Sequence, residues 1–157
     1  MTDLNPIIAD RFTEHLEVFG KTMEHMDTIQ EIAYRCKAAL DNGNKILFCG
    51  NGGSAADSQH LAAELIGRFK KERRSFAAVA LTTDTSALTA IANDYDFDTV
   101  FARQVEGLGR TGDVLIGIST SGNSKNVVKA AEMARSIGMH TIAFTGEGGG
   151  KLAELCD

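Results

Sequence analysis

Four hydroxyl side chains crowd one short stretch of the sequence, where an apolar segment ends and a helical pattern begins. Residues 114–118 are typical of a buried strand, and residues 126–134 have the spacing of an amphipathic helix. The hydroxyl residues between them are Ser119, Thr120, Ser121 and Ser124. Hydroxyls and backbone N–H groups at a helix N-terminus suit an anion, and a phosphate monoester is the natural ligand. The alternative interpretation is a Ser/Thr-rich turn with an N-cap.

A second strand-to-helix junction, Cys49-Gly-Asn-Gly-Gly-Ser54, has the same design. An apolar strand pattern ends, glycines let the backbone approach a ligand, and a serine opens a helix. The residues placed to touch a ligand are Asn51, Gly52 and Gly53. One such turn is a weak signal, whereas two on strands of one sheet are a stronger one. We expect one loop to hold phosphate and the other to hold sugar hydroxyls. No Walker lysine follows the serine loop, which disfavours a nucleoside triphosphate.

His60 and Glu64 stand four residues apart in the helix expected after Ser54, so both lie on one helical face. An imidazole and a carboxylate in this arrangement could share a divalent metal, zinc being the usual choice. They could also act as acid and base. The alternative is a hydrogen-bonded surface pair, which is common at this spacing.

Two further polar segments are candidates for contacts with a sugar. Asn93 and Asp94 follow an apolar helical pattern, where they could either bind sugar or end the helix. Residues 82–86 (Thr-Thr-Asp-Thr-Ser) follow another strand pattern, and they could line the same cleft or cap a helix.

Composition narrows the class of protein. The chain has 157 residues, which suffices for one domain with a sizeable core. Its formal charge of -5 argues against a general nucleic-acid binder, which needs a basic face. The one dense basic run, residues 70–74, favours a solvated loop. Three cysteines without a CxxC pair suit a reducing cytoplasm. The sequence predicts no signal peptide and no membrane span.

The order of the expected elements predicts an α/β fold. Residues 1–43 are predicted to form two helices, and residues 44–157 a parallel α/β core in the same domain. Expected strands are 45–49, 76–81, 113–118 and 140–144. Expected helices in the core are 54–69, 84–93, 98–108, 123–137 and one beginning at Lys151. Such alternation gives a parallel sheet with helices on both faces, and its ligands bind at the carboxyl ends of the strands.

Five segments together carry a resemblance to a known family. They are residues 49–54, 60–68, 81–88, 92–95 and 117–124. In these segments the chain resembles the sedoheptulose 7-phosphate isomerases, or phosphoheptose isomerases, of the sugar isomerase (SIS) domain family. The serine loop alone marks a SIS domain, and the His-x-x-x-Glu helix beside the glycine-rich loop narrows the resemblance to these isomerases. The resemblance covers essentially the whole chain and implies a three-layer α/β/α sandwich with flavodoxin-like topology.

The resemblance implies roles for the matching positions. Asn51, Gly52, Gly53, Asn93 and Asp94 would contact substrate, and Glu64 would act as catalytic base. The serine loop (Ser119, Thr120, Ser121 and Ser124) would hold the phosphate of a seven-carbon sugar. His60 and Glu64 would bind one zinc ion per subunit. The family is typically a homotetramer with its N-terminal helices at the interface. For this chain we expect a cytoplasmic protein that binds neither nucleic acid nor membrane.

Family members continue beyond the equivalent of Asp157 through another strand and a helix, which carry a Gln and a His of the metal site. The metal site of this chain is therefore expected to be incomplete. The implied reaction interconverts sedoheptulose 7-phosphate and D-glycero-D-manno-heptose 7-phosphate through an enediol, which starts ADP-heptose or GDP-heptose synthesis for lipopolysaccharide or other surface glycans. The alternatives are a phosphosugar sensor and the non-catalytic relative that binds the initiator protein DnaA. That relative lacks a glutamate at the position of Glu64, so Glu64 favours the enzyme.

Overall fold

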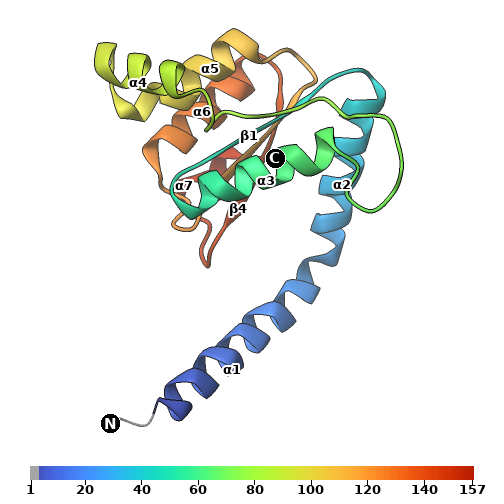
Figure 1. Ribbon diagram of the computed structural model, residues 1–157, viewed down its shortest axis with the longest axis vertical. Helices are drawn as coiled ribbons and strands as arrows, with labels where there is room; N and C mark the ends of the chain where they lie inside the picture. The colour runs from blue at the N-terminus through green and yellow to red at the C-terminus, as the bar shows by residue number, and fades with distance from the viewer. Residues whose placement is uncertain (1–3) are drawn as a thin grey trace. The chain divides into compact units, whose positions relative to one another are not determined.

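The computed structural model describes residues 4–157, which form two compact units, one ending at Tyr34 and the other beginning at Arg35 (Figure 1). The first unit is helical: α1 (Asn5–Thr22) leads through a 3-10 turn, η1 (Met23–His25), into α2 (Met26–Asp41), whose residues from Arg35 on belong to the second unit. No described residue of α1 is buried, and Leu4 is its N-cap, with proline in its first turn. In the sequence, Asp27 with Gln30 three residues later predicts a cap that opens a second helix. This prediction is wrong, because α2 begins at Met26 and the chain stays helical through η1.

The second unit is built on a parallel sheet, as the sequence predicts. Its strands are β1 (Ile46–Gly50), β2 (Ala78–Ala80), β3 (Val114–Ser119) and β4 (His140–Thr145). They lie in the order β2-β1-β3-β4, and every neighbouring pair is parallel. The register places Gly50 of β1 beside Ile118 of β3, so the two candidate loops leave the sheet side by side. The strand predicted over residues 76–81 is shorter in the structure, where only 78–80 pair with β1.

Helices cover both faces of this sheet, which makes the unit a three-layer sandwich (Figure 1). They are α3 (Gly53–Ile66), α4 (Thr85–Asp94), η2 (Phe97–Thr99), α5 (Val100–Leu108), α6 (Lys125–Ser136) and α7 (Gly150–Leu155). Alternate residues of each strand face opposite layers, as parallel strands require. Leu47, Cys49 and Leu115 join the core cluster with α5 and α6, whereas Ile46 and Phe48 line a hollow together with side chains of α3.

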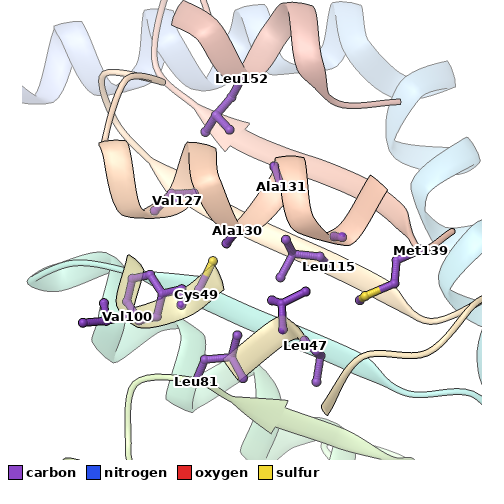
Figure 2. Packing of buried hydrophobic residues seen from close by; sticks show 13 residues of the cluster. Leu47, Cys49, Leu81, Val100, Leu115, Val127, Ala130, Ala131, Met139 and Leu152 are labelled. Carbon is purple, nitrogen blue, oxygen red and sulfur yellow. The ribbon is translucent and has the colours of Figure 1, made fainter. Parts of the chain in front are cut away.

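The main core lies between the sheet and helices α5, α6 and α7 (Figure 2). Alanines 130, 131 and 134 of α6 let this helix pack closely against β3. A Cβ at Gly117 of β3 would lie 2.7 Å from Val127 of α6, so a larger residue there would push the helix away. Burial, followed in importance by nearby Cys156, raises the pKa of the Cys49 thiol to about 12. Cys49 therefore acts as a small core residue, and all three cysteines of the chain are free.

The amino end of β3 contains a buried carboxylate. The side chain of Asp113 is only 1% exposed and accepts hydrogen bonds from the backbone N–H groups of Lys45 and Arg110, at 2.9 and 2.8 Å. It also accepts from the Lys45 ammonium and from the side-chain amide of Asn44. Burial alone raises the pKa of this carboxyl, but the hydrogen bonds from Lys45, Arg110 and Asn44 outweigh it, and the net pKa lies below its ordinary value.

Candidate functional site

The two candidate loops lie together at the carboxyl edge of the sheet. Asn51 directly follows β1, and Asn126 belongs to the first turn of α6, which follows β3. Their side-chain amides bond to each other in both directions, at 2.9 and 2.8 Å. The expectation that the loops share one edge is therefore met by direct contact, and the site is assembled where parallel sheets place their ligands.

The serine loop brings three of its four hydroxyls together. The Ser119 hydroxyl donates to Ser124 Oγ at 2.9 Å, and Ser121 Oγ lies 3.5 Å from Ser119 Oγ. Ser121 Oγ also accepts from the backbone N–H of Asn123 at 3.1 Å, which orders the turn. Ser119 is buried, whereas Thr120 and Ser121 are exposed. The hydroxyls form a compact group that opens to solvent through Ser121.

Helix α6 adds an electrostatic preference for anions at this group. Ser124 is its N-cap, but the side chain makes no capping hydrogen bond to the helix in the described structure; its Oγ accepts from Ser119. The first N–H groups of a helix have no carbonyl in a preceding turn and carry the positive end of the helix dipole. Hydroxyls and helix N-terminus therefore point to the same ligand class, a phosphate or a similar anion.

A glycine-rich segment, residues 146–150, supports the serine loop from β4. The N–H of Gly146 donates to Thr120 O at 2.9 Å, and the N–H of Leu152 donates to Gly122 O at 3.1 Å. Gly122 has a φ of +63°, and a Cβ there would lie 1.8 Å from Gly149 O. No side chain fits between the two segments, so the position of the serine loop depends on this contact.

The glycine-rich loop after β1 places one side chain and a bare backbone beside the serine loop. Gly52 is the N-cap of α3 with a φ of 56° and a ψ of -121°, a conformation that favours glycine. Gly52 and Gly53 are exposed, and Asn51 is half-buried. The loop is closed by the N–H of Ser54, which donates to Asn51 O at 3.0 Å. A sugar could therefore approach the backbone at 52–53 and the Asn51 amide together.

His60 and Glu64 lie on one face of α3, as their spacing predicts. Nε2 of His60 is 3.7 Å from Oε1 of Glu64, and the side chains are 72% and 37% exposed. Both border the hollow of about 760 Å³ on this side of the sheet, which is lined largely by apolar side chains. The imidazole and the carboxylate are suitable zinc ligands, but residues 4–157 contain no cluster of three or more His, Cys, Asp or Glu side chains that could hold a metal. The pair thus fits two positions of a zinc site.

Asn93 and Asp94 lie at the end of α4 and are exposed. The Asn93 side chain donates to Asp94 Oδ1 at 2.9 Å, so the two residues form one polar group. Their part in substrate binding stays a prediction. In the segment 82–86, Asp84 is the N-cap of α4 and accepts from the N–H of Ala87 at 2.9 Å, which supports the capping interpretation for this residue.

Two residues beside the site were missed by the sequence reasoning. Asn126 was counted only as part of a helix, although its side chain pairs with Asn51. Arg73 was assigned to a solvated basic run, but its guanidinium donates to the backbone carbonyls of Glu64 and Leu65, at 2.8 and 2.9 Å, near the end of α3. Basic residues that close a helix usually stand in or next to its last turn, whereas Arg73 lies well beyond the end of α3 at Ile66, so no local signal distinguishes it, and none distinguishes Asn126.

Comparisons with known proteins agree with this architecture. The model of the SIS domain family matches residues 10–146. The phosphoheptose isomerase of Aliarcobacter butzleri is 59% identical over 151 residues, which are 96% of this chain and 80% of that protein. The phosphoheptose isomerase of Akkermansia muciniphila is 60% identical over 150 residues, or 96% of this chain and 76% of that protein. In the part of the chain that the structure describes, no helix is both long and apolar enough to cross a membrane.

Solved structures give the same result. The phosphoheptose isomerase GmhA from Neisseria gonorrhoeae superposes with a TM-score of 0.92 at 50% identity, over 99% of this chain and 82% of that one. A phosphoheptose isomerase from Francisella tularensis gives a TM-score of 0.93 at 37% identity, over 100% of this chain and 82% of that one. By its family model, its close relatives and its fold, the chain belongs to the phosphoheptose isomerases of the SIS domain family.

Proposed function

We propose that this protein is the aldose–ketose isomerase that interconverts sedoheptulose 7-phosphate and D-glycero-D-manno-heptose 7-phosphate. The observation that carries the proposal is the pairing of an anion-binding serine loop with an acid–base pair on the helix that follows the neighbouring strand. The relatives at 59% and 60% identity carry the matching name. A phosphosugar sensor would need the serine loop but not the carboxylate of Glu64.

The serine loop binds the phosphate and thereby fixes one end of the open-chain sugar. Hydroxyls of Ser119, Ser121 and Ser124, with the N-terminus of α6, supply hydrogen bonds to phosphate oxygens. Asn51 and the backbone of Gly52 and Gly53 contact sugar hydroxyls, as do Asn93 and Asp94. Holding the phosphate end of the substrate fixes the reacting carbon in position and orientation relative to the catalytic base.

Glu64 performs the proton transfer in this proposal. Its carboxylate removes a proton from C1, beside the ketose carbonyl, while that carbonyl oxygen gains a proton, which gives an enediol. The proton then passes from the carboxyl to C2 while the C1 hydroxyl loses its proton, which gives the aldose. His60, 3.7 Å from Glu64, is the neighbouring group that can orient this carboxylate. The apolar lining of the adjacent hollow limits the water that competes for the carboxylate.

His60 and Glu64 are the residues of this chain that would hold zinc. When bound, zinc supplies positive charge that stabilises oxygen anions near it. Two ligands are fewer than a protein zinc site normally has, so further ligands from outside this pair are required. We also propose that the enzyme is a cytoplasmic homotetramer with its N-terminal helices at the subunit interface, and that its product feeds ADP-heptose or GDP-heptose synthesis for lipopolysaccharide or other surface glycans.

The test is to incubate the purified protein with sedoheptulose 7-phosphate in deuterated water, with and without added zinc, and to follow the sugar by NMR. The proposal expects the aldose 7-phosphate to form, with deuterium at its second carbon because the proton passes through an exchangeable carboxyl. Binding of the sugar phosphate without aldose formation or exchange would contradict the isomerase and favour a sensor.

A further inference from the structure

Asn51 and Asn126 form a reciprocal pair of amides between the two loops of the site. Asn51 Nδ2 donates to Asn126 Oδ1 at 2.9 Å, and Asn126 Nδ2 donates to Asn51 Oδ1 at 2.8 Å. Asn126 is 4% exposed, whereas Asn51 is half-buried and borders the exposed glycines of its loop. One partner is therefore enclosed by protein, and the other reaches the surface where a sugar would bind.

The pair fixes an orientation that Asn51 alone would not keep. The terminal torsion of an asparagine side chain is broad, so an unpaired amide at the surface samples many orientations. Two hydrogen bonds in opposite directions hold both amide planes together. Each amide has two N–H donors and an oxygen with two lone pairs, and the pairing uses one N–H and one lone pair of each. Asn51 keeps a second N–H and a second lone pair for a ligand.

The chain fold explains why the partner must come from α6. Gly50 and Ile118 are register partners in neighbouring strands, and the helices that follow β1 and β3 begin at the same edge of the sheet. Asn126 is the second residue of α6 and is buried next to Val127, which packs in the core. The anchor of Asn51 is thus tied to the rigid layer below the site.

We propose that Asn126 is a positioning residue, which holds the Asn51 amide in the orientation needed to bind a sugar hydroxyl and leaves phosphate binding to the serine loop. This inference rests on the proposed function, because it assigns the Asn51 amide to the sugar part of a phosphosugar. It separates two binding contributions: the phosphate depends on the serine loop, and the sugar depends on the amide pair.

The first test measures binding of sedoheptulose 7-phosphate and of inorganic phosphate by calorimetry for the parent and for Asn51→Ala, Asn126→Ala and the double variant. Each single change should weaken sugar-phosphate binding roughly 10-fold, the scale of one oriented hydrogen bond. Inorganic phosphate should bind as in the parent. The double variant should be no worse than Asn51→Ala, because Asn126 acts through Asn51.

Asn126→Asp gives a readout that a purely structural role would not change. When protonated, the new carboxyl can donate to Asn51 Oδ1 and accept from Asn51 Nδ2, whereas the ionised form loses the donor. Relative to the parent at each pH, binding of sedoheptulose 7-phosphate by Asn126→Asp should recover as the pH falls from about 7.5 towards about 4, the range in which an aspartate carboxyl gains its proton. The recovery should vanish when Asn51 is replaced by alanine. If it persists there, the new charge acts directly on the phosphate and the proposal is wrong.

The remaining outcomes are also decisive. Parent-like sugar-phosphate binding by Asn126→Ala, equal weakening of inorganic phosphate, or additive losses in the double variant would each overturn the positioning role while leaving the isomerase intact. If Asn126→Ala fails to fold, the binding measurements rely on Asn51→Ala, which lies in a half-exposed loop, and on Asn126→Asp. A parent that does not bind sedoheptulose 7-phosphate would instead contradict the proposed function, and with it the role of Asn126.

Discussion

Both ends of strand β3 carry a buried polar side chain, but the two side chains differ in the kind of hydrogen-bond partner that they have. At the amino end, Asp113 accepts hydrogen bonds from two backbone N–H groups, an ammonium and an amide, all from the protein. At the carboxyl end, Ser119 bonds to Ser124, and Ser121 lies within 3.5 Å of it. The partners of Asp113 at the amino end are backbone N–H groups, an ammonium and an amide, whereas the side chains at the carboxyl end bond mainly to other hydroxyls, and the backbone N–H of Asn123 donates to Ser121.

This difference separates stability from function along one strand. The Asp113 carboxylate accepts from four donor groups of the protein and, being ionised, cannot itself donate. Removing it is costly, because its four partners would be left without an acceptor. Hydroxyls whose side-chain partners are other hydroxyls can turn to a phosphate oxygen, since each can donate or accept. We therefore expect changes at the amino end to alter folding, and changes at the carboxyl edge to alter binding and turnover with little effect on folding.

The largest effect is expected for Glu64→Gln, which removes the proposed base and keeps the size of the side chain. Turnover should fall by about 100-fold or more, the usual scale for a general base, while the melting temperature stays near that of the parent. The matched control is Glu72→Gln, because Glu72 is an exposed partner of Arg68 on the surface. Near-parent turnover in Glu64→Gln would move the protein towards a sensor.

The next effect is expected for Ser119→Ala combined with Ser121→Ala. Each lost hydrogen bond to a charged phosphate should cost about 1.5–3 kcal/mol, so phosphosugar binding should weaken by at least about 100-fold. Calorimetry measures the affinity, and Ser136→Ala at the other end of α6 is the control, since its hydroxyl bonds only to Met133 within the described residues. Unchanged affinity in the double variant would contradict the claim that the hydroxyls at the carboxyl end of β3 bind the phosphate.

A smaller effect on stability is expected for Asp113→Asn, which deprives several donors of their acceptor. Unfolding free energy should fall by about 2 kcal/mol at pH 7, whereas Asp41→Asn, in an exposed pair with Lys37, should change it little. Because the pKa of Asp113 is lowered by folding, its contribution is present above the ordinary carboxyl range and is lost as the pH falls through the folded pKa. The difference between parent and variant should therefore shrink below about pH 4 in denaturant titrations. A difference that grows on acidification would contradict this account of the amino end.

The smallest effect is expected for Arg73→Met. This change tests whether α3, like β3, has one end that is closed by protein hydrogen bonds and one end that is open to ligand. Its first residues open onto the ligand edge, and its last carbonyls are closed by Arg73. Loss of these bonds should cost about 1 kcal/mol and speed amide exchange at Gly67, whose N–H donates to Ala63 O at 2.8 Å. Lys71→Met, in the same basic run, should leave the exchange unchanged. Equal exchange in both variants would show that Arg73 does not close the helix.

The sequence predicted those parts of the site that depend on local spacing. Both loops stand at strand-to-helix junctions, and His60 and Glu64 share a helical face because four residues make about one turn. The parallel sheet is confirmed as well, since alternation of strands and helices leaves few other arrangements.

The parts that were missed depend on long-range contacts or on competing local preferences. Asn126 pairs with a residue 75 positions away, and only the register of β1 and β3 brings the two together. At Asp27 the capping pattern was outweighed, because a short 3-10 segment carries the helix through to α2 without a break. The roles of the site residues towards substrate and zinc stay predictions.

The most direct test of the contrast between the two ends of β3 is an NMR titration of the unmodified protein with inorganic phosphate. We expect the largest amide shifts at residues 119–126, where the hydroxyls and the first turn of α6 meet, and no significant shifts at 110–114, where Asp113 is closed off. Shifts concentrated at the amino end, or none at the serine loop at saturating phosphate, would contradict the assignment of binding to the carboxyl edge.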